Sequence, residues 1–322
     1  MKCLVTGVAG FIGSHLAERL LAGGHSVIGV DCFTDYYARS LKEQNLAEIK
    51  GNPLFQFIEH DLAEMDLAPL ISDADWVFHQ AAQAGVRASW GSYFEHYIRN
   101  NIHSTQALLE ACKNSAVKRF IYASSSSVYG DSDDLPLTEG SLPRPVSPYG
   151  VTKLAGEHLC RLYEKNFRIP TVSLRYFTVY GPRQRPDMAF NLFIRALMDG
   201  REILLYGDGL QTRDFTFISD IVEANISAAE SNLAVGETIN VGGGSQVSVN
   251  DVISRLQEIT RHSVKVKRLG FQKGDVRHTL ADISKARSLL GYRPLVKLQE
   301  GLKEEYDWLN RNRKMYEVKS ER

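Results

Sequence analysis

Two side chains with a clear capacity for chemistry, Tyr149 and Lys153, lie four positions apart in the segment SPYGVTKLAGEHL. The segment reads as a helix start, and this spacing places both side chains on one helix face. A free phenol has a pKa of about 10 and is a poor base at neutral pH, but a nearby ammonium lowers that pKa. We therefore expect Tyr149 to exchange a proton with a substrate hydroxyl, with Lys153 as its helper. A tyrosine and a lysine at this spacing also occur by chance, so the position of the pair in the fold decides whether a catalytic role is expected.

Four consecutive serines, Ser124 to Ser127, follow the predicted strand KRFIYASS or end it. Ligands of open α/β sheets bind outside the carboxyl ends of the strands. Small hydroxyls at this point can hydrogen-bond a reacting oxygen and the phenol of Tyr149. The alternative is a serine-rich turn without a chemical role. The predicted helix at 148–167 follows this strand, and this position favours catalysis by the tyrosine–lysine pair.

A glycine loop lies near the start of the chain. Gly7, Gly10 and Gly13 form G-x-x-G-x-x-G between a predicted strand, KCLVTG, and a predicted helix that begins at Phe11. In that setting the pyrophosphate of a dinucleotide rests on backbone N–H groups at the helix N-terminus. Phe11 and Ile12 are expected to contact it as well. Glycines also serve tight turns, but the order strand, turn, helix favours cofactor binding.

Asp31 ends the second predicted strand, SVIGVD. A carboxylate there accepts hydrogen bonds from the adenosine ribose and repels a 2′-phosphate, so we expect NAD rather than NADP. Arg39, further along, keeps NADP open as an alternative. Asp61 and Leu62 follow the third strand and are expected near the adenine, and Tyr176 is expected to contact the cofactor from a later strand.

The elements that position these residues alternate between short β-branched runs and amphipathic segments of helix length. We predict strands at KCLVTG, SVIGVD, FQFIEH, DWVFHQAA, KRFIYASS and TVSLRYF, and helices over residues 11–22, 41–49 and 148–167. This alternation is typical of βαβ units and of a parallel sheet with helices on both faces. The sequence therefore predicts an α/β fold with a doubly wound parallel (Rossmann) sheet over residues 1–178.

Beyond residue 178 the regular alternation of strands and helices ends, because loop-rich stretches with several arginines separate shorter elements. We predict a smaller C-terminal α/β lobe that binds substrate over residues 179–322. Within it, residues 217–230 have helical periodicity. The segment near 212–232 is expected to pack back on the first domain.

Composition limits the possible partners. The 38 Lys and Arg residues balance 38 Asp and Glu residues, so no overall field favours nucleic acid or an anionic membrane. Cys3, Cys32, Cys112 and Cys160 lie far apart without a C-x-x-C pair, and we expect buried free thiols and no metal site. No apolar run reaches the ~18 residues of a spanning helix. Together with the start MKCLVTG, this favours a cytoplasmic protein.

Several motifs together carry a resemblance that spans nearly the whole chain. Besides the glycine loop and Asp31 they are HQAAQAGVR, NNIHST, SSSSVYG, YGVTK, RYFTVYGPRQRPDM, YGDGLQTRDF and GDVRHT. The chain resembles the extended short-chain dehydrogenases of the NAD-dependent epimerase/dehydratase family, which act on nucleotide sugars. The resemblance implies that Ser125 is the catalytic hydroxyl beside Tyr149, and that Lys153 also binds the nicotinamide ribose.

Ser126 and Ser127 favour one branch of that family. Its dehydratases carry an Asp-Glu pair at these positions and its decarboxylases a Glu. Two serines cannot readily supply the acid and base that expel a C6 hydroxyl. An epimerase needs neither, because it oxidises C4, lets the keto sugar turn over and returns the same hydride from a tightly bound, recycled NAD. We expect a C4 epimerase, with Ser126 at the catalytic site and Ser127 against the substrate.

The run from Thr178 to Ala189 is similar to that of UDP-glucuronate 4-epimerases, whereas UDP-glucose 4-epimerases usually have Asn at position 178. An arginine fork binds a carboxylate through two parallel hydrogen bonds, and Arg185 is the candidate for the C6 carboxylate, with Thr178 assisting. The expected reaction converts UDP-glucuronate to UDP-galacturonate. UDP-glucose 4-epimerase and UDP-glucuronate decarboxylase remain alternatives, as does a surface role for Arg185.

For the UDP half, the resemblance implies that Arg213 and Arg277 bind the diphosphate and Asp275 the ribose. Asn191 and the loop at 206–209 would complete the uridine pocket. The resemblance also implies a homodimer through helices near residues 93–112 and 148–167. Candidate apolar contacts, which pack equally well within a subunit, are Leu108, Leu109, Cys112, Leu159 and Leu162.

Overall fold

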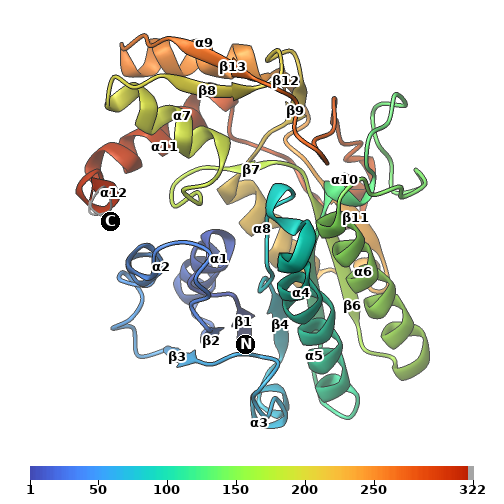
Figure 1. Ribbon diagram of the computed structural model, residues 1–322. Helices are drawn as coiled ribbons and strands as arrows, with labels where there is room; N and C mark the ends of the chain where they lie inside the picture. The colour runs from blue at the N-terminus through green and yellow to red at the C-terminus, as the bar shows by residue number, and fades with distance from the viewer. Residues whose placement is uncertain (318–322) are drawn as a thin grey trace.

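A seven-stranded parallel sheet forms the centre of the computed structural model, which describes residues 1–317 (Figure 1). Its strand order is β11-β6-β5-β4-β1-β2-β3. Strands follow one another outward from β1 in both directions, which defines a doubly wound Rossmann sheet. The strands are β1 Lys2–Thr6, β2 Ser26–Asp31, β3 Phe55–Glu59, β4 Trp76–His79, β5 Arg119–Ser125, β6 Thr171–Tyr176 and β11 Thr238–Val241. The predicted fold class is confirmed.

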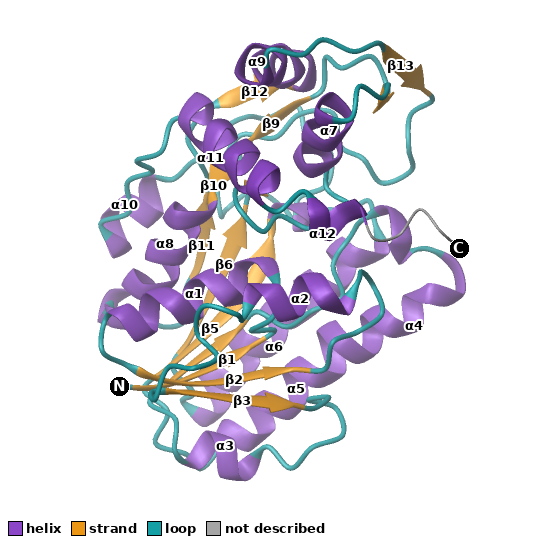
Figure 2. Ribbon diagram, turned by 90° about the vertical axis from the view of Figure 1, so that its left-hand side faces the viewer, coloured by secondary structure: helices purple, strands orange, loops and turns teal. Residues whose placement is uncertain are grey.

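Helices cover both faces of this sheet (Figure 2). One face carries α1 Phe11–Ala22, α2 Arg39–Asn45 and α8 Ile218–Glu230, and the other carries α3 Ala68–Ser72, α5 Ser104–Cys112 and α6 Pro148–Phe167. Neighbouring residues of one strand therefore enter different cores. Val5 belongs to the cluster that contains Leu16 of α1, whereas Leu4 belongs to the cluster that contains Leu108 of α5. Burial on both faces explains why the strands read as continuous apolar runs.

Helix α6 lies unusually close to strand β5. A side-chain carbon at Gly156 would collide with the phenol of Tyr122, and one at Gly150 would collide with the carbonyl oxygen of Ser127. The helix begins at Pro148, and the hydroxyl of Ser147 caps it by accepting a hydrogen bond from the N–H of Gly150 at 3.1 Å. Proline at the first helical position and serine at the cap are favourable choices. The start of α6 is therefore fixed against the end of β5.

The chain beyond β6 builds a smaller layer above the carboxyl ends of the strands (Figure 1). Its strands form three pairs: β7 Val179–Tyr180 with β10 Thr216–Phe217, β8 Ile203–Tyr206 with β13 Val266–Leu269, and β9 Thr212–Asp214 with β12 Gln246–Ser248. Its helices are α7 Ala189–Met198, α9 Val249–Thr260, α10 Ser284–Leu290, α11 Leu298–Arg311 and α12 Lys314–Glu317. Two short helices of the first part, α4 Phe94–Tyr97 and a π-helix at Ile98–His103, lead into α5.

Two segments of the second half return to the sheet. Strand β11 pairs with β6, so the boundary that we predicted at residue 178 misses one strand of the sheet. Helix α8 packs against α1, and an ion pair between Arg19 and Glu223 joins them at 2.6 Å. The division into a domain at 1–178 and a lobe at 179–322 otherwise stays a prediction.

Two local expectations need correction. The helix predicted at 41–49 runs from Arg39 to Asn45, because residues 46–50 form turns. Of the four free cysteines Cys32 is exposed, because it follows the last residue of β2; the others are buried. Within residues 1–317, no helix combines the length and the apolar character needed to cross a membrane.

Candidate active site

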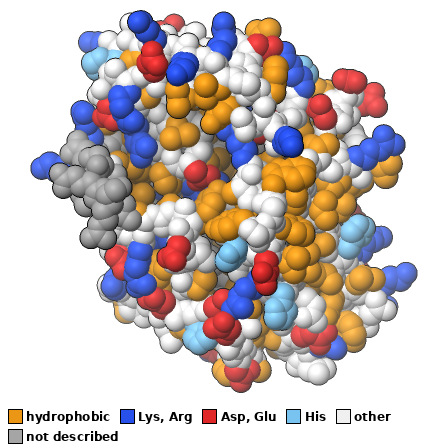
Figure 3. All heavy atoms as spheres, viewed as in Figure 1, with side chains coloured by type: hydrophobic (Ala, Val, Ile, Leu, Met, Phe, Trp, Pro, Cys, Tyr) orange, Lys and Arg blue, Asp and Glu red, His pale blue; other side chains and the backbone are white. Residues whose placement is uncertain are grey.

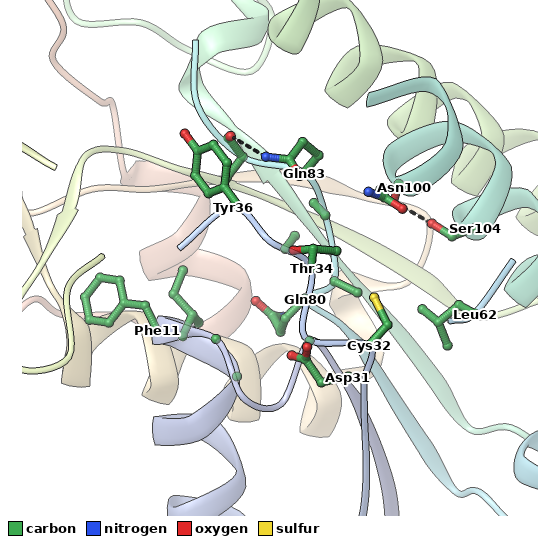
Figure 4. A pocket seen from close by; sticks show the side chains of 18 of the residues that line it. Phe11, Asp31, Cys32, Thr34, Tyr36, Leu62, Gln80, Gln83, Asn100 and Ser104 are labelled. Atoms are coloured by element: carbon green, nitrogen blue, oxygen red, sulfur yellow. Dashed lines mark hydrogen bonds between the residues drawn. The ribbon is translucent and has the colours of Figure 1, made fainter. Parts of the chain in front are cut away.

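One cleft at the carboxyl ends of the strands gathers most of the predicted site residues (Figure 4). Tyr149 and Arg185 line it from two other elements. All ten residues expected to contact the cofactor also line it: Gly7, Gly10, Phe11, Ile12, Gly13, Asp31, Asp61, Leu62, Lys153 and Tyr176. The sequence motifs are therefore brought together in a single place.

The glycine loop forms a backbone cradle beneath the N-terminus of α1. Gly7 has a left-handed φ of +67°, and a side-chain carbon there would lie 2.8 Å from the backbone of Ala81. A carbon at Gly13 would collide with the carbonyl oxygen of Gly7. Only glycine leaves this space open, next to the positive end of the helix dipole. The cradle fits the pyrophosphate of a dinucleotide.

Asp31 ties the end of β2 to the glycine loop. Its carboxylate accepts hydrogen bonds from the N–H groups of Phe33 at 2.8 Å and Ala9 at 3.1 Å, and burial raises its pKa. Arg39, which kept NADP open, makes a bidentate ion pair with Glu59 at 2.6 and 2.7 Å. That guanidinium is already engaged by a carboxylate, which weakens the case for a 2′-phosphate.

Two polar contacts that the sequence did not predict fix Tyr176. Its hydroxyl donates to Oδ1 of Asn225 in α8 at 2.9 Å and lies 3.2 Å from Oε1 of Gln80. Gln80 lies in the cleft wall after β4 (Figure 4). Asp61 has a similar anchor, because Arg99 donates to it at 2.8 Å. These partners lie far apart in the sequence, so no local pattern reveals them.

Tyr149 and Lys153 occupy the first turns of α6, as predicted. The ammonium of Lys153 donates to the carbonyl oxygen of Ala123 in β5 at 2.7 Å, and burial lowers its pKa to about 8. Burial raises the pKa of Tyr149, which a hydrogen bond with Ser125 and the charge of Arg185 partly offset. The pKa of Tyr149 therefore lies above that of a free phenol, and its lowering by Lys153 stays a prediction.

The serines face different directions. Ser125 ends β5, and its Oγ lies 3.1 Å from both the Oγ and the N–H of Ser127, so it caps a short 3₁₀ helix at Ser126–Val128. Ser124 points into the core, where its hydroxyl donates to Glu157. Ser125 is the serine that acts on the pKa of Tyr149, while Ser126 and Ser127 lie in the 3₁₀ helix that follows it.

A buried asparagine of the π-helix joins the cleft wall to α6. Asn101 donates to the hydroxyl of Thr152 at 2.9 Å and to the carbonyl oxygen of Gln83 at 3.0 Å, and it accepts from the N–H of Gln83 at 2.7 Å. Thr152 lies between the two reactive residues of α6. The motif NNIHST contains Asn101, but only the π-helix turns this side chain inward.

Arg185 enters the cleft from the loop after β7. Its guanidinium donates to Asp187 from Nε at 3.0 Å and from Nη2 at 2.9 Å, and its charge acts on the phenol of Tyr149. Arg185 lines the same cleft as the reactive tyrosine, which argues against a purely surface role. Thr178 lies half-buried between β6 and β7 and is not among the residues that line the cleft.

The other predicted cations gather in the second lobe. Arg277 pairs with Asp208 at 2.8 Å, and Asp275 pairs with Arg87 at 2.7 Å. Burial lowers the pKa of Arg213, on which the charges of Asp275, Arg87 and Arg277 also act, so these groups form one cluster. Arg87, at the start of a 3₁₀ helix, is a member that the sequence analysis missed.

Asn191 does not reach this cluster. It is fully buried in α7, where its amide donates to the carbonyl oxygen of Gln184 at 2.9 Å and its N–H to Oε1 of Gln184 at 3.1 Å. Its role is therefore to hold the loop that carries Arg185, and the expectation of a uridine contact is not supported by its position. Among residues 1–317, no three His, Cys, Asp or Glu side chains are grouped as a metal site.

The family of the chain follows from its sequence as well as its site. A family model described as the NAD dependent epimerase/dehydratase family matches residues 3–242, a range that includes the whole sheet except Lys2 and the whole cleft around Tyr149. The chain belongs to this family.

Known relatives match nearly the whole chain. A Bacillus subtilis protein named as an uncharacterised UDP-glucose epimerase, YtcB, is 45% identical over 96% of this chain and 98% of its own. UDP-glucuronate 4-epimerase of Thermodesulfobacterium geofontis is 39% identical over 96% of both chains. A crystal structure of UDP-glucuronic acid 4-epimerase from Bacillus cereus, in complex with UDP-glucuronic acid and NAD, is 49% identical with a TM-score of 0.95, over 97% of this chain and 100% of that one.

Substitution of Gly13 by alanine tests the cofactor cradle. The added carbon would collide with the carbonyl oxygen of Gly7, so the turn must open, and we expect NAD affinity to fall at least about tenfold. NAD retained through purification and a titration of the stripped protein measure the effect. Gly51→Ala is the control, because a carbon at that position meets nothing within 4 Å. Equal NAD affinity in the two variants would contradict the role of this turn.

Proposed function

We propose that this protein converts UDP-glucuronate to UDP-galacturonate by epimerisation at C4, with a tightly bound NAD that returns to its starting state in each cycle. The observation that carries the substrate assignment is the guanidinium of Arg185 in the cleft beside Tyr149. The similarity to the Bacillus cereus enzyme that binds UDP-glucuronic acid and NAD supports the same conclusion.

The reactive groups divide the work of moving one proton. Bound NAD supplies the hydride acceptor, and later the donor, at C4. Tyr149 takes the proton of the C4 hydroxyl as C4 becomes a ketone and returns it after the keto sugar has turned its other face. Ser125 hydrogen-bonds the phenol, and together with the charge of Arg185 it offsets part of the cost of ionising a buried tyrosine. Lys153, held on β5, is placed to bind the nicotinamide ribose.

Arg185 has a second task in this scheme. Oxidation at C4 makes a β-keto acid, which loses CO2 when the breaking bond aligns with the carbonyl π system. A guanidinium that binds the C6 carboxylate through two parallel hydrogen bonds holds it away from that alignment. Thr178, Ser126 and Ser127 are proposed to assist at the same end of the sugar.

The nucleotide is proposed to lie under the second lobe. Arg213 and Arg277 would neutralise the diphosphate and Asp275 would accept from the ribose, with Arg87 as an additional cation. Each of these side chains already forms an ion pair or a hydrogen bond with the backbone. Binding of the nucleotide would therefore replace these partners and would not bury unpaired charges.

Two other reactions have to be compared with the proposed epimerisation of UDP-glucuronate. UDP-glucose epimerisation matches the name of the Bacillus subtilis relative, and it would leave Arg185 without a carboxylate to bind. Decarboxylation of UDP-glucuronate would use the same clamp, but Ser126 and Ser127 stand where decarboxylases of the family carry a glutamate. The position of Arg185 in the cleft, together with Ser126 and Ser127, favours epimerisation of UDP-glucuronate.

The substrate is identified by incubating the purified holoenzyme separately with UDP-glucuronate and UDP-glucose, without added NAD, and following the products by NMR. We expect UDP-galacturonate alone from the first substrate and little turnover of the second. A UDP-pentose product would favour the decarboxylase, and turnover of UDP-glucose only would overturn the role of Arg185. Tyr149→Phe is the control, since it removes the proposed proton carrier and should abolish turnover.

The homodimer remains a proposal, with a changed set of contacts. Leu108, Leu109 and Cys112 are buried within the subunit, so they cannot form the interface as expected. Leu159 is half-buried, whereas Leu162 is exposed on α6. Figure 3 shows apolar side chains gathered over the region of α4 and α6, and the exposed apolar residues of these helices are Ile98, at the end of α4, Val151, Leu162 and Phe167.

Leu162→Glu tests this face, because a charge at the centre of an apolar contact must lose its water on association. We expect sedimentation velocity to show a dimer for the original protein and a monomer for the variant at micromolar concentration. Leu233→Glu, at a position 71% exposed in a different part of the surface, is the matched control. A monomeric original protein, or a dimer that survives Leu162→Glu, would contradict the proposed interface.

We also propose that the enzyme works in the cytoplasm. The described chain holds four free cysteines, three of them buried, and unpaired thiols suit a reducing compartment. Recovery of the activity in the membrane or extracellular fraction of cells would contradict this location.

A further inference from the structure

The loop that carries Arg185 contains a second charged residue, Asp187, which the scheme above does not use. Asp187 accepts from Nε and Nη2 of Arg185 at 3.0 and 2.9 Å, so it occupies one edge of the guanidinium. A guanidinium has five N–H donors in a fixed plane. Within residues 1–317, Nη1 of Arg185 has no hydrogen-bond partner. The outer edge, formed by Nη1 and the second hydrogen of Nη2, therefore remains for another acceptor.

Asp187 is itself held from the first domain. The hydroxyl of Tyr36 donates to its Oδ2 at 3.2 Å, and the guanidinium of Arg185 lies 5.7 Å from the centre of the Tyr36 ring. Tyr36 belongs to the loop after Asp31 and stands in the cleft wall (Figure 4). Its phenol is confined, because a side-chain carbon at Gly85 would collide with it. A chain of contacts thus joins the cofactor loop to the arginine fork.

We propose that Tyr36 and Asp187 are positioning residues that fix the plane of the Arg185 guanidinium, so that its outer edge offers two parallel donors to the C6 carboxylate. The inference rests on the proposed function. Beyond that function, specificity for a carboxylate depends on two residues, Tyr36 and Asp187, that do not themselves touch the substrate.

The orientation of that plane decides which reaction follows oxidation at C4. If a change of ring conformation brings the C5–C6 bond parallel to the π system of the ketone, that bond breaks and CO2 leaves. The electron pair enters the ketone as an enolate, and C5 takes a proton from water. Return of the hydride to C4 then gives a UDP-pentose. A guanidinium held on two sides fixes the position of the carboxylate and so opposes this change of ring conformation.

Removal of the negative charge of Asp187 would change the affinity for UDP-glucuronate in opposite directions for two possible roles of this residue. A carboxylate that merely neutralised Arg185 would weaken substrate binding, and its removal would tighten the affinity for UDP-glucuronate. A carboxylate that orients Arg185 has the opposite effect, because the fork loses its fixed plane when Asp187 is removed. The two roles are therefore separated by the direction of one change in affinity.

The test uses holoenzyme with Asp187→Asn and, independently, Tyr36→Phe, and it measures the dissociation constants of UDP-glucuronate and UDP by calorimetry. We expect UDP-glucuronate to bind on the order of tenfold more weakly to Asp187→Asn, as for the loss of a charged hydrogen bond, and less so to Tyr36→Phe. UDP, which lacks the sugar, should bind within twofold of the original protein. NMR of the turnover mixture should show UDP-pentose beside UDP-galacturonate. Asp199→Asn, which removes a surface ion pair with Arg201, is the control.

Unchanged or tighter binding of UDP-glucuronate by Asp187→Asn would overturn the proposal. An equal loss of affinity for UDP and for UDP-glucuronate would also overturn it. Asp187 would then stabilise the second lobe as a whole and not the orientation of the Arg185 guanidinium. If the original protein does not convert UDP-glucuronate, the proposed function fails, and this is seen before any variant is made. Conversion by the original protein with unaltered variants refutes only the inference.

Discussion

The contact between helix α6 and strand β5 holds the reactive groups together, because glycines of the helix and its first turn leave room for the helix to pack closely on the strand and its end. Gly156 gives Tyr122 the space for this approach. The same contact places Lys153 against the carbonyl oxygen of Ala123 and Ser125 against the phenol of Tyr149. Two elements separated by a long loop thereby present one set of proton-handling groups. Overpacking at such a contact costs about 1–3 kcal/mol, which makes the position of the helix part of the chemistry.

Electrostatic pairing is the second constraint on this site. A chain with equal numbers of cationic and anionic side chains still offers several guanidinium groups to an anionic ligand, and it pairs three of them, Arg87, Arg185 and Arg277, with an aspartate. Arg185 pairs with Asp187 and Arg277 with Asp208. Such pairs avoid unpaired buried charges and give each fork a defined plane. The selectivity of the proposed enzyme then follows from orientation as much as from charge.

The sequence predicted the parallel sheet, the cofactor cradle and the tyrosine–lysine pair, because each has a local pattern of fixed spacing. It missed strand β11, a run of four residues, TINV, that becomes a strand only by pairing with β6. It also missed Tyr36 and Arg87, whose contacts with Asp187 and Asp275 join residues far apart in the chain. The contact of the Asn191 amide with Gln184, in the turn before α7, was not predicted either. Contacts over long separations carry no signature in a single sequence.

In the proposed reaction, one hydride leaves C4 and returns to the same carbon. UDP-glucuronate that carries deuterium at C4 tests it directly when it is incubated with the holoenzyme in ordinary water containing an excess of unlabelled NADH. The account predicts that UDP-galacturonate retains deuterium at C4, as read by proton NMR and mass spectrometry. Product with ordinary hydrogen at C4 would show that the hydride comes from outside the bound cofactor, and it would contradict the account.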